Sequence, residues 1–422
     1  MMQPLVRKII LRTAVFILSA LAMTGLLVLA ASIPPDLIRE KSLESAEYLS
    51  GQEIFGCVIK DVEGSRIDKY ADAILLNIAS HYDPSDPLRS VMLSAYYFTP
   101  YQEEKDNFLE SVREDKAANR QYLRYWHGSN IIVRPLLTLL SVKQIYVFNG
   151  IILVILFALY IILCVRYREP VPGAGMTVSL ILTSVWFVPL SLEYTWTVQL
   201  MLVFSSASLI LVRRGKRGAY GILLLIAGMV TNYFDFLTAE TLTLLVPLLL
   251  ILWSVPERGR ERIGICIDGA LSWSAGYVGM WILKWVLASL ILGESAMPYV
   301  TEHIEERLGG DLGLNIWQYM TGAVWRNIIC LFPVGYGAFG AFAAILLLVF
   351  AAYRGYVYHV RDLDRGFILL CVIIGLIPYI RYLVLHNHSY LHCFFTFRAQ
   401  AATVLAVIMI LGELRGKRTA VN

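Results

Sequence analysis

Two carboxylates stand four residues apart in the segment Ile67–Ala79, at Asp68 and Asp72. Apolar residues at positions 67, 71, 74, 75 and 78 follow a helical period, so the segment predicts an amphipathic helix that Pro84 and Pro87 terminate. Residues four apart lie on one helix face, about one turn from each other, where like charges repel mildly. A positioned carboxylate is what a general base requires. A polar face solvated at a membrane surface is the alternative.

A second group of residues that can do chemistry stands near position 125, where basic and aromatic side chains are mixed. Tyr and Trp are enriched at membrane interfaces, which accounts for the aromatic ones. Arg124, His127 and Arg134 need a different explanation, because cations at the rim of a helix bundle can bind a phosphate or an anionic lipid head group. An interfacial belt and a phosphate site stay as alternatives.

Ionisable residues also interrupt strongly apolar segments. Asn232, Asp235 and Glu240 lie in one short connection, and Lys284 stands among apolar residues further along. An ionisable group at membrane depth is costly, so it normally faces a cavity or a partner. For Lys284 the alternative is that its long side chain reaches the outer membrane surface. Asp268 in the same apolar segment is predicted to be interfacial.

The last cluster combines Asn387, His388, Tyr390 and His392 with Arg398. Histidines so close together could ligate a metal, but their spacing matches no standard zinc site and no Cys-x-x-Cys accompanies them. Hydrogen bonding to a substrate is therefore the preferred role, and a purely structural polar loop is the alternative. We assign no metal ligands and require no cofactor, with a divalent cation as the alternative.

The composition shows what must position these residues. The chain has 422 residues, of which 57% are hydrophobic and 16% charged. Soluble domains carry about a quarter charged residues, so soluble enzymes, fibrous proteins and disordered tails are excluded. The net charge of +4 is small, and the basic residues form short clusters between apolar runs, which orients membrane spans and gives no support to nucleic-acid binding. The chain is predicted to be an all-α polytopic membrane protein.

A helix needs about 20 apolar residues to cross a bilayer. By this criterion the sequence predicts ten transmembrane helices, near residues 9–31, 145–165, 174–191, 196–212, 218–232, 237–254, 263–292, 335–353, 366–384 and 399–413. The first is interpreted as an uncleaved anchor, with a signal peptide cleaved after Ala31 as the alternative.

The distribution of Lys and Arg predicts the orientation. Every second connection is basic, beginning with Arg7, Lys8 and Arg12, so both termini are predicted to be cytoplasmic. This divides the chain into a first helix (1–31), a large extracytoplasmic loop with juxtamembrane helices (32–144), a bundle (145–413) with a further extracytoplasmic loop (293–334), and a cytoplasmic tail (414–422). The polar clusters all fall on the extracytoplasmic side, where binding or chemistry is expected.

This layout resembles the GT-C class of integral-membrane glycosyltransferases. Those enzymes also have an extracytoplasmic first loop that opens on a juxtamembrane helix, and at motif level the likeness rests on Ile67-Asp68-Lys69-Tyr70-Ala71-Asp72. The chain is also similar to an uncharacterised set of Gram-positive bacterial membrane proteins around Arg124–Gly128, Asn232–Thr238 and Asn387–Arg398. That second resemblance implies no activity.

The first resemblance implies transfer of a sugar from a polyprenyl-phosphate donor to a cell-envelope acceptor, outside the cytoplasm of a bacterium and at its plasma membrane. Asp68 would be the general base that deprotonates the acceptor hydroxyl, and Asp72 would orient it or bind sugar. The departing phosphate needs cations, and those available are Arg124, Arg134, Lys284, Arg326 and Arg398. Among them Lys284 and Arg398 are preferred.

Three other functions stay open. A flippase or transporter of lipid-linked sugars would use the same cations, but no internal repeat of the kind common in transporters is visible. A polymerase or ligase of surface polysaccharide is chemically close, and usually has its large outer loop later in the chain. A non-catalytic assembly protein would tolerate the change Asp68→Asn.

Overall fold

The computed structural model describes residues 4–301, 313–331 and 363–414, with scattered positions between 342 and 353. Over these residues the regular structure is helical, and the only β pairing is two isolated bridges, Cys57 with Arg66 and Tyr96 with Arg120. The expected all-α membrane protein is confirmed at this level, because six helices are long and apolar enough to cross a membrane.

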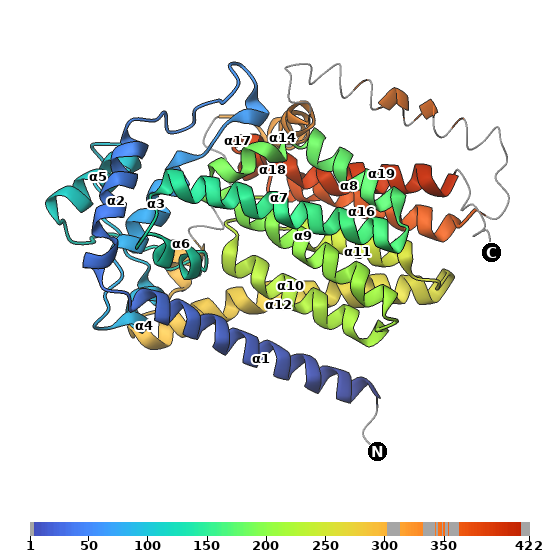
Figure 1. Ribbon diagram of the computed structural model, residues 1–422, viewed down its shortest axis with the longest axis horizontal. Helices are drawn as coiled ribbons and strands as arrows, with labels where there is room; N and C mark the ends of the chain where they lie inside the picture. Colours follow the sequence, from blue (N-terminus) through green and yellow to red (C-terminus); the bar gives the residue numbers. More distant parts are fainter. Residues whose placement is uncertain are drawn as a thin grey trace.

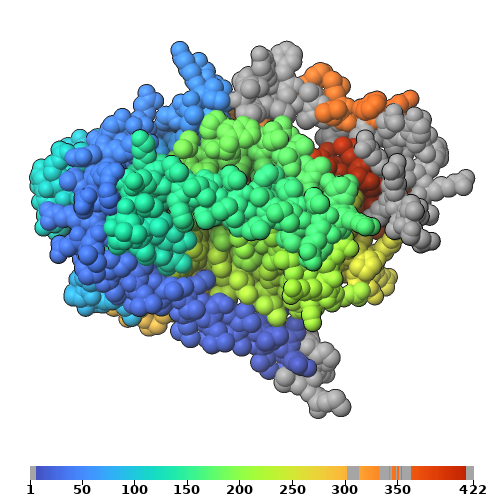
Figure 2. All heavy atoms as spheres, viewed as in Figure 1, coloured from blue at the N-terminus to red at the C-terminus, as the bar shows by residue number. Residues whose placement is uncertain are grey.

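Five of these six are α1 (Pro4–Ala31), α7 (Val142–Tyr167), α9 (Leu192–Arg213), α12 (Gly259–Leu292) and α16 (Arg365–Val384). The sixth, Cys393–Leu414, joins α18 (Cys393–Thr396), η4 (Phe397–Gln400) and α19 (Ala401–Leu414). They run side by side as a bundle (Figure 1). Figure 2 shows α7 lying across its surface, and apolar side chains such as Val147 and Val154 are exposed there, as a lipid-facing helix requires.

The other predicted spans differ in length or lie outside the described residues. The segment 174–191 divides into α8 (Pro170–Leu182) and η2 (Val185–Leu190), because Ser184 adopts a left-handed conformation. Helices α10 (Tyr220–Phe234) and α11 (Leu242–Ser254) are shorter than a full span. The predicted span 335–353 lies almost wholly outside the described residues, as do residues 415–422 of the tail. The number ten therefore stays a prediction.

Residues 32–141 form a helical cap on one end of the bundle (Figure 1). Its elements are α2 (Pro35–Ser50), η1 (Glu63–Ser65), α3 (Lys69–Ser80), α4 (Pro87–Leu93), α5 (Glu104–Glu114) and α6 (Asn130–Leu136). The amphipathic helix predicted over 67–79 is confirmed as α3, whose apolar face is buried. We call the end of the bundle that this cap covers the cap end.

A helix also occupies part of the predicted loop 293–334. α14 (Ile316–Cys330) begins with a capping box, in which Asn315 and Gln318 each accept a backbone N–H from the other. Its exposed Trp and Ile side chains are interspersed with buried Tyr319 and Ala323, so an amphipathic helix stands where the sequence indicated only a loop.

The end of the bundle opposite the cap carries the ion pairs that join α1 to α12. Asp268 on α12 accepts from Lys8 at 2.7 Å and from Arg12 at 2.7 and 2.9 Å. Further along, α12 packs closely on α10. Gly228 and Gly276 permit this close approach, because a side chain at either position would overlap the backbone of the other helix. These contacts bring the far end of α12 to the cap.

Candidate functional site

Asp72 is fully buried, and its carboxylate joins the cap to the bundle. It accepts hydrogen bonds from Tyr146, from the Ser191 hydroxyl at 3.1 Å and from the backbone N–H of Leu192 at 2.8 Å. The last two groups belong to the N-terminus of α9, where a negative charge is stabilised. Lys69 Nζ lies 3.9 Å from the same carboxylate and donates to the Leu190 carbonyl at 2.6 Å. The position of Asp72 is therefore fixed by several donors at once.

Asp68 caps the N-terminus of α3 by accepting the backbone N–H of Ala71 at 2.8 Å. The side chain is only 4% exposed, so the alternative of a solvated polar face is wrong for both acids. Burial raises the pKa of Asp68 to about 7, the Ala71 N–H opposes this shift, and the charge of Asp72 adds to it. Asp68 therefore titrates in the range where a general base is effective.

The Asp68 carboxyl is hydrogen-bonded to a second buried carboxyl, that of Glu193 in the first turn of α9. Two carboxyl groups in hydrogen-bond contact hold a proton between them, because two adjacent negative charges are unfavourable away from water. Glu193 was not among the site residues predicted from the sequence. The available signal was an acid two residues after the helix-capping Ser191, at the start of an apolar run.

Arg398 is buried beside the first turn of α9. Its guanidinium lies 4.8 Å from the centre of the Tyr194 ring, and Tyr194 directly follows Glu193. It donates to the carbonyls of Phe394 at 3.0 Å and Gly64 at 3.4 Å. Within the described part of the chain, Arg398 Nε has no hydrogen-bond partner. Tyr194 thus has Arg398 over its ring and Asp68 and Glu193 among its charged neighbours, which links this cation with an unused donor to the acid pair.

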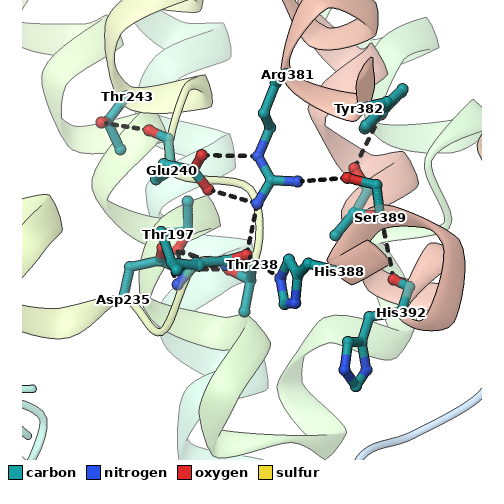
Figure 3. A network of polar contacts seen from close by, with 12 residues as sticks. Thr197, Asp235, Thr238, Glu240, Thr243, Arg381, Tyr382, His388, Ser389 and His392 are labelled. Atoms are coloured by element: carbon teal, nitrogen blue, oxygen red, sulfur yellow. Dashed lines mark hydrogen bonds and ion pairs between the residues drawn. The ribbon is translucent and has the colours of Figure 1, made fainter. Parts of the chain in front are cut away.

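Asp235 and Glu240 hold the connection between α10 and α11 in place. Asp235 accepts from the Thr197 hydroxyl at 2.7 Å and from the Leu237 N–H at 2.8 Å. Glu240 forms a two-point ion pair with Arg381 of α16, at 2.7 and 3.0 Å. Figure 3 shows Arg381 between Glu240 and Ser389. An ionisable group at membrane depth was expected to face a cavity or a partner, and both acids have a partner.

The histidine cluster belongs to the same network. His388 Nε2 lies 2.9 Å from the carbonyl oxygen of Leu237, which also accepts from Arg381 at 2.6 Å. The His392 ring lies 4.9 Å from His388 and stacks on Phe395 at 5.1 Å. Asn387 is buried in α17 (His386–Leu391). Among the residues that the structure describes, no three His, Cys, Asp or Glu side chains group as a metal site would require.

Arg134 and Lys284 serve the cap itself. Arg134 donates to carbonyls at the C-terminal end of α3, those of Ala79 and Tyr82, and to Ile33 at 2.6 Å. Lys284 donates to the carbonyls of Val91 at 2.8 Å and Met92 at 3.1 Å in the last turn of α4. Cations in such positions satisfy the unpaired carbonyls of helix ends. Both side chains are fully buried, so Lys284 does not reach a membrane surface.

The residues near position 125 are packed rather than arranged as an interfacial belt. Trp126 is buried and donates to the Met280 carbonyl at 2.9 Å, so a belt role is wrong for this residue. Arg124 donates to the Tyr122 hydroxyl at 2.8 Å. Burial and then the charge of Lys284 lower the pKa of His127 to about 3, so His127 is neutral. Asn232, on α10, is also buried.

The first two turns of α9 bring several of the predicted residues together. Ser191 contacts Asp72, Glu193 contacts Asp68, Tyr194 lies beside Arg398, and Thr197 donates to Asp235. Arg134 and Lys284 instead belong to contacts of α3 and α4 with α6 and α12. The candidate site is therefore the acid pair of Asp68 and Glu193 with Arg398.

Searches of protein-family models, curated proteins and solved structures return no match to this chain.

Proposed function

We propose that this chain is an inverting glycosyltransferase of the membrane, which moves a sugar from a polyprenyl-phosphate donor to an acceptor of the cell envelope. The observation that carries the proposal is the buried carboxyl pair of Asp68 and Glu193, in which burial raises the pKa of Asp68 to about 7 although the hydrogen bond from Glu193 opposes the shift. A carboxylate with a pKa near the working pH accepts a proton effectively.

The reaction uses these groups in a direct displacement. Asp68 takes the proton of the acceptor hydroxyl, and the hydroxyl oxygen attacks the anomeric carbon of the donor sugar. The bond from that carbon to the phosphate oxygen breaks, and the electron pair leaves with polyprenyl phosphate. Charge develops on the departing phosphate, and the unused Arg398 Nε–H is a donor that can stabilise it. No metal is required by this scheme, and a divalent cation is the alternative source of positive charge.

The proposal also places the cap end outside a bacterial plasma membrane. Supporting this, the basic residues at the opposite end of the bundle are numerous and lie near helix termini, as cytoplasmic residues do. They include Lys8, Arg12, Arg213, Arg217, Arg258 and Arg262.

A turnover assay in nanodiscs tests the proposal. Purified full-length protein is given a panel of polyprenyl-phosphate sugars, and both donor binding and released polyprenyl phosphate are measured. We expect binding by wild type and by Asp68→Asn, with release by wild type only. Asp83→Asn, at an exposed acid of the cap, is the matched control and should retain release. Binding without release by any form would favour a flippase, and absence of binding would remove the transferase.

A further inference from the structure

An open apolar groove runs between α14, α16 and α17, with a volume of about 730 Å³. Its walls include Thr321, Val324 and Trp325 of α14, Leu383 of α16 and Tyr390 of α17. Trp317 and Trp325 are 71% and 53% exposed, so α14 presents large apolar side chains beside the groove. Trp side chains favour the interface between membrane and water. Because its walls are mostly apolar, the groove is suited to a hydrocarbon chain.

Positive charge lies next to one of the residues that line this groove. The Arg326 guanidinium stacks on the Tyr390 ring, 4.6 Å from its centre, and Tyr390 lines the groove. Glu63 pairs with two arginines, with Arg66 at 2.7 Å and with Arg326 at the long distance of 3.9 Å. All three side chains are about one third exposed. Two guanidinium groups that share one carboxylate leave a net positive charge, which complements an anion with several acceptor oxygens.

We propose that this groove holds the isoprenoid chain of a polyprenyl phosphate, with its phosphate bound between Arg66 and Arg326. The inference rests on the proposed function and identifies where the lipid of the donor binds. A free phosphate would leave the apolar groove unused, and a neutral lipid would leave the two arginines unused. A single chain that ends in a phosphate uses both.

The place of the arginines relative to the acid pair fits this assignment. Arg66 lies two residues before Asp68, and Glu63 is adjacent to Gly64, whose carbonyl accepts from Arg398 at 3.4 Å. A phosphate held between Arg66 and Arg326 therefore lies on the side of the site where Arg398 and Asp68 are found. Arg326 is among the cations predicted from the sequence, and Arg66 is not.

Binding of sugar-free undecaprenyl phosphate tests the inference without requiring turnover. The full chain is placed in nanodiscs of phosphatidylcholine, and bound lipid is measured by native mass spectrometry, with undecaprenol as the neutral probe. Arg326→Gln should weaken phosphate-lipid binding about tenfold, the loss expected for one charge-assisted hydrogen bond, and leave undecaprenol binding unchanged. Thr321→Trp, which fills the groove, should weaken both. Trp186→Leu, at an exposed Trp of η2 that does not line the groove, is the control and should bind as wild type.

Three outcomes would overturn the inference: wild-type binding by Thr321→Trp, wild-type binding by Arg326→Gln, or equal competition by phosphatidylglycerol, which would make the groove a general site for anionic lipids. Elution of each variant as a monodisperse peak from size-exclusion chromatography shows that a loss of binding is not a loss of fold. If the lipid binds as expected and no sugar is ever transferred, the proposed function fails while the groove assignment stands.

Discussion

The backbone N–H of Leu192 donates to the Asp72 carboxylate at 2.8 Å, across 120 residues of sequence. Through this bond and that of Ser191, a residue of the cap fixes the first turn of α9. The next residue of that turn, Glu193, is thereby held against Asp68. The two acids thus differ in role: Asp72 holds α9 in position, and Asp68, which caps α3, is the carboxyl that we propose as the general base.

This division predicts opposite effects for two otherwise identical substitutions. Asp68→Asn should abolish sugar transfer and leave the thermal unfolding midpoint near that of wild type. Asp72→Asn should lower the midpoint, because an amide cannot accept from all three donors, and a buried donor left unpaired costs about 1–3 kcal/mol. Thermal unfolding and turnover are measured on the same preparations. Equal losses of stability in the two variants would contradict the division of roles.

The pH dependence of stability and activity should run in opposite directions. Burial raises the pKa of Asp68 from its ordinary value of 3.8 to about 7 in the fold. Between these two values the folded chain holds a proton that the unfolded chain releases. This contribution to stability is complete below the unfolded pKa and is lost as the pH rises towards 7. Turnover should instead rise with pH and level off above an apparent pKa of about 7.

The control for this prediction is Asp68→Asn. Its stability should change less than that of wild type between about pH 5 and about pH 8, because the titrating group is absent. A wild-type turnover profile that is flat over this range would show that Asp68 is not the base.

Breaking the Arg381–Glu240 pair should lower the stability of the protein strongly, whereas replacing both side chains with apolar ones should lower it less. Glu240→Gln leaves the buried Arg381 guanidinium without its counter-charge, and we expect a loss of about 3–5 kcal/mol of stability. The double variant Arg381→Met with Glu240→Met should recover part of this loss, because no unpaired charge is left buried. Thermal unfolding in detergent of the single and double variants measures the difference. A double variant less stable than the single one would mean that the bond from Arg381 to Leu237 dominates.

Lys284 offers a test of whether a buried cation serves the fold. Lys284→Met should destabilise the protein by about 1–3 kcal/mol, because the buried Met92 carbonyl would lose its Lys284 donor and the Val91 carbonyl would keep only the Ser94 hydroxyl. Lys8→Met is the matched control, since Lys8 is part-exposed in its ion pair with Asp268 and should contribute little. A stable Lys284→Met protein with weakened donor binding would instead return Lys284 to the phosphate site.

Close packing at Gly128 gives a prediction independent of charge. The Gly128 N–H donates to the Tyr233 carbonyl at 2.9 Å, and an added methyl group would overlap both that carbonyl and the Tyr233 ring. Gly128→Ala should therefore lower the unfolding midpoint, with a cost of about 1–3 kcal/mol for overpacking. Gly25→Ala in α1 meets no atom within 4 Å and should be neutral or slightly stabilising. Equal midpoints for the two variants would contradict the packing seen at Gly128.

The sequence by itself determined the class of the protein and several of its elements. Apolar runs long enough to span a bilayer predict membrane helices, because each helix satisfies its own backbone groups within one segment. The helical period over 67–79 predicted α3 for the same local reason. The rule that ionisable groups at membrane depth have partners correctly indicated that Asp235 and Glu240 would be engaged.

Only the tertiary structure decided which partner each residue has. Arg134 reaches Ile33 across 101 residues, and Arg381 reaches Glu240 across 141, so no local pattern distinguishes a cation that caps a helix from one that could bind a phosphate. The role of Glu193 depends on its contact with Asp68, and Trp126 is buried where α12 and Tyr233 of α10 pack against it. Periodicity reports which face of an element is buried, whereas chemistry depends on distances between elements that are far apart in sequence.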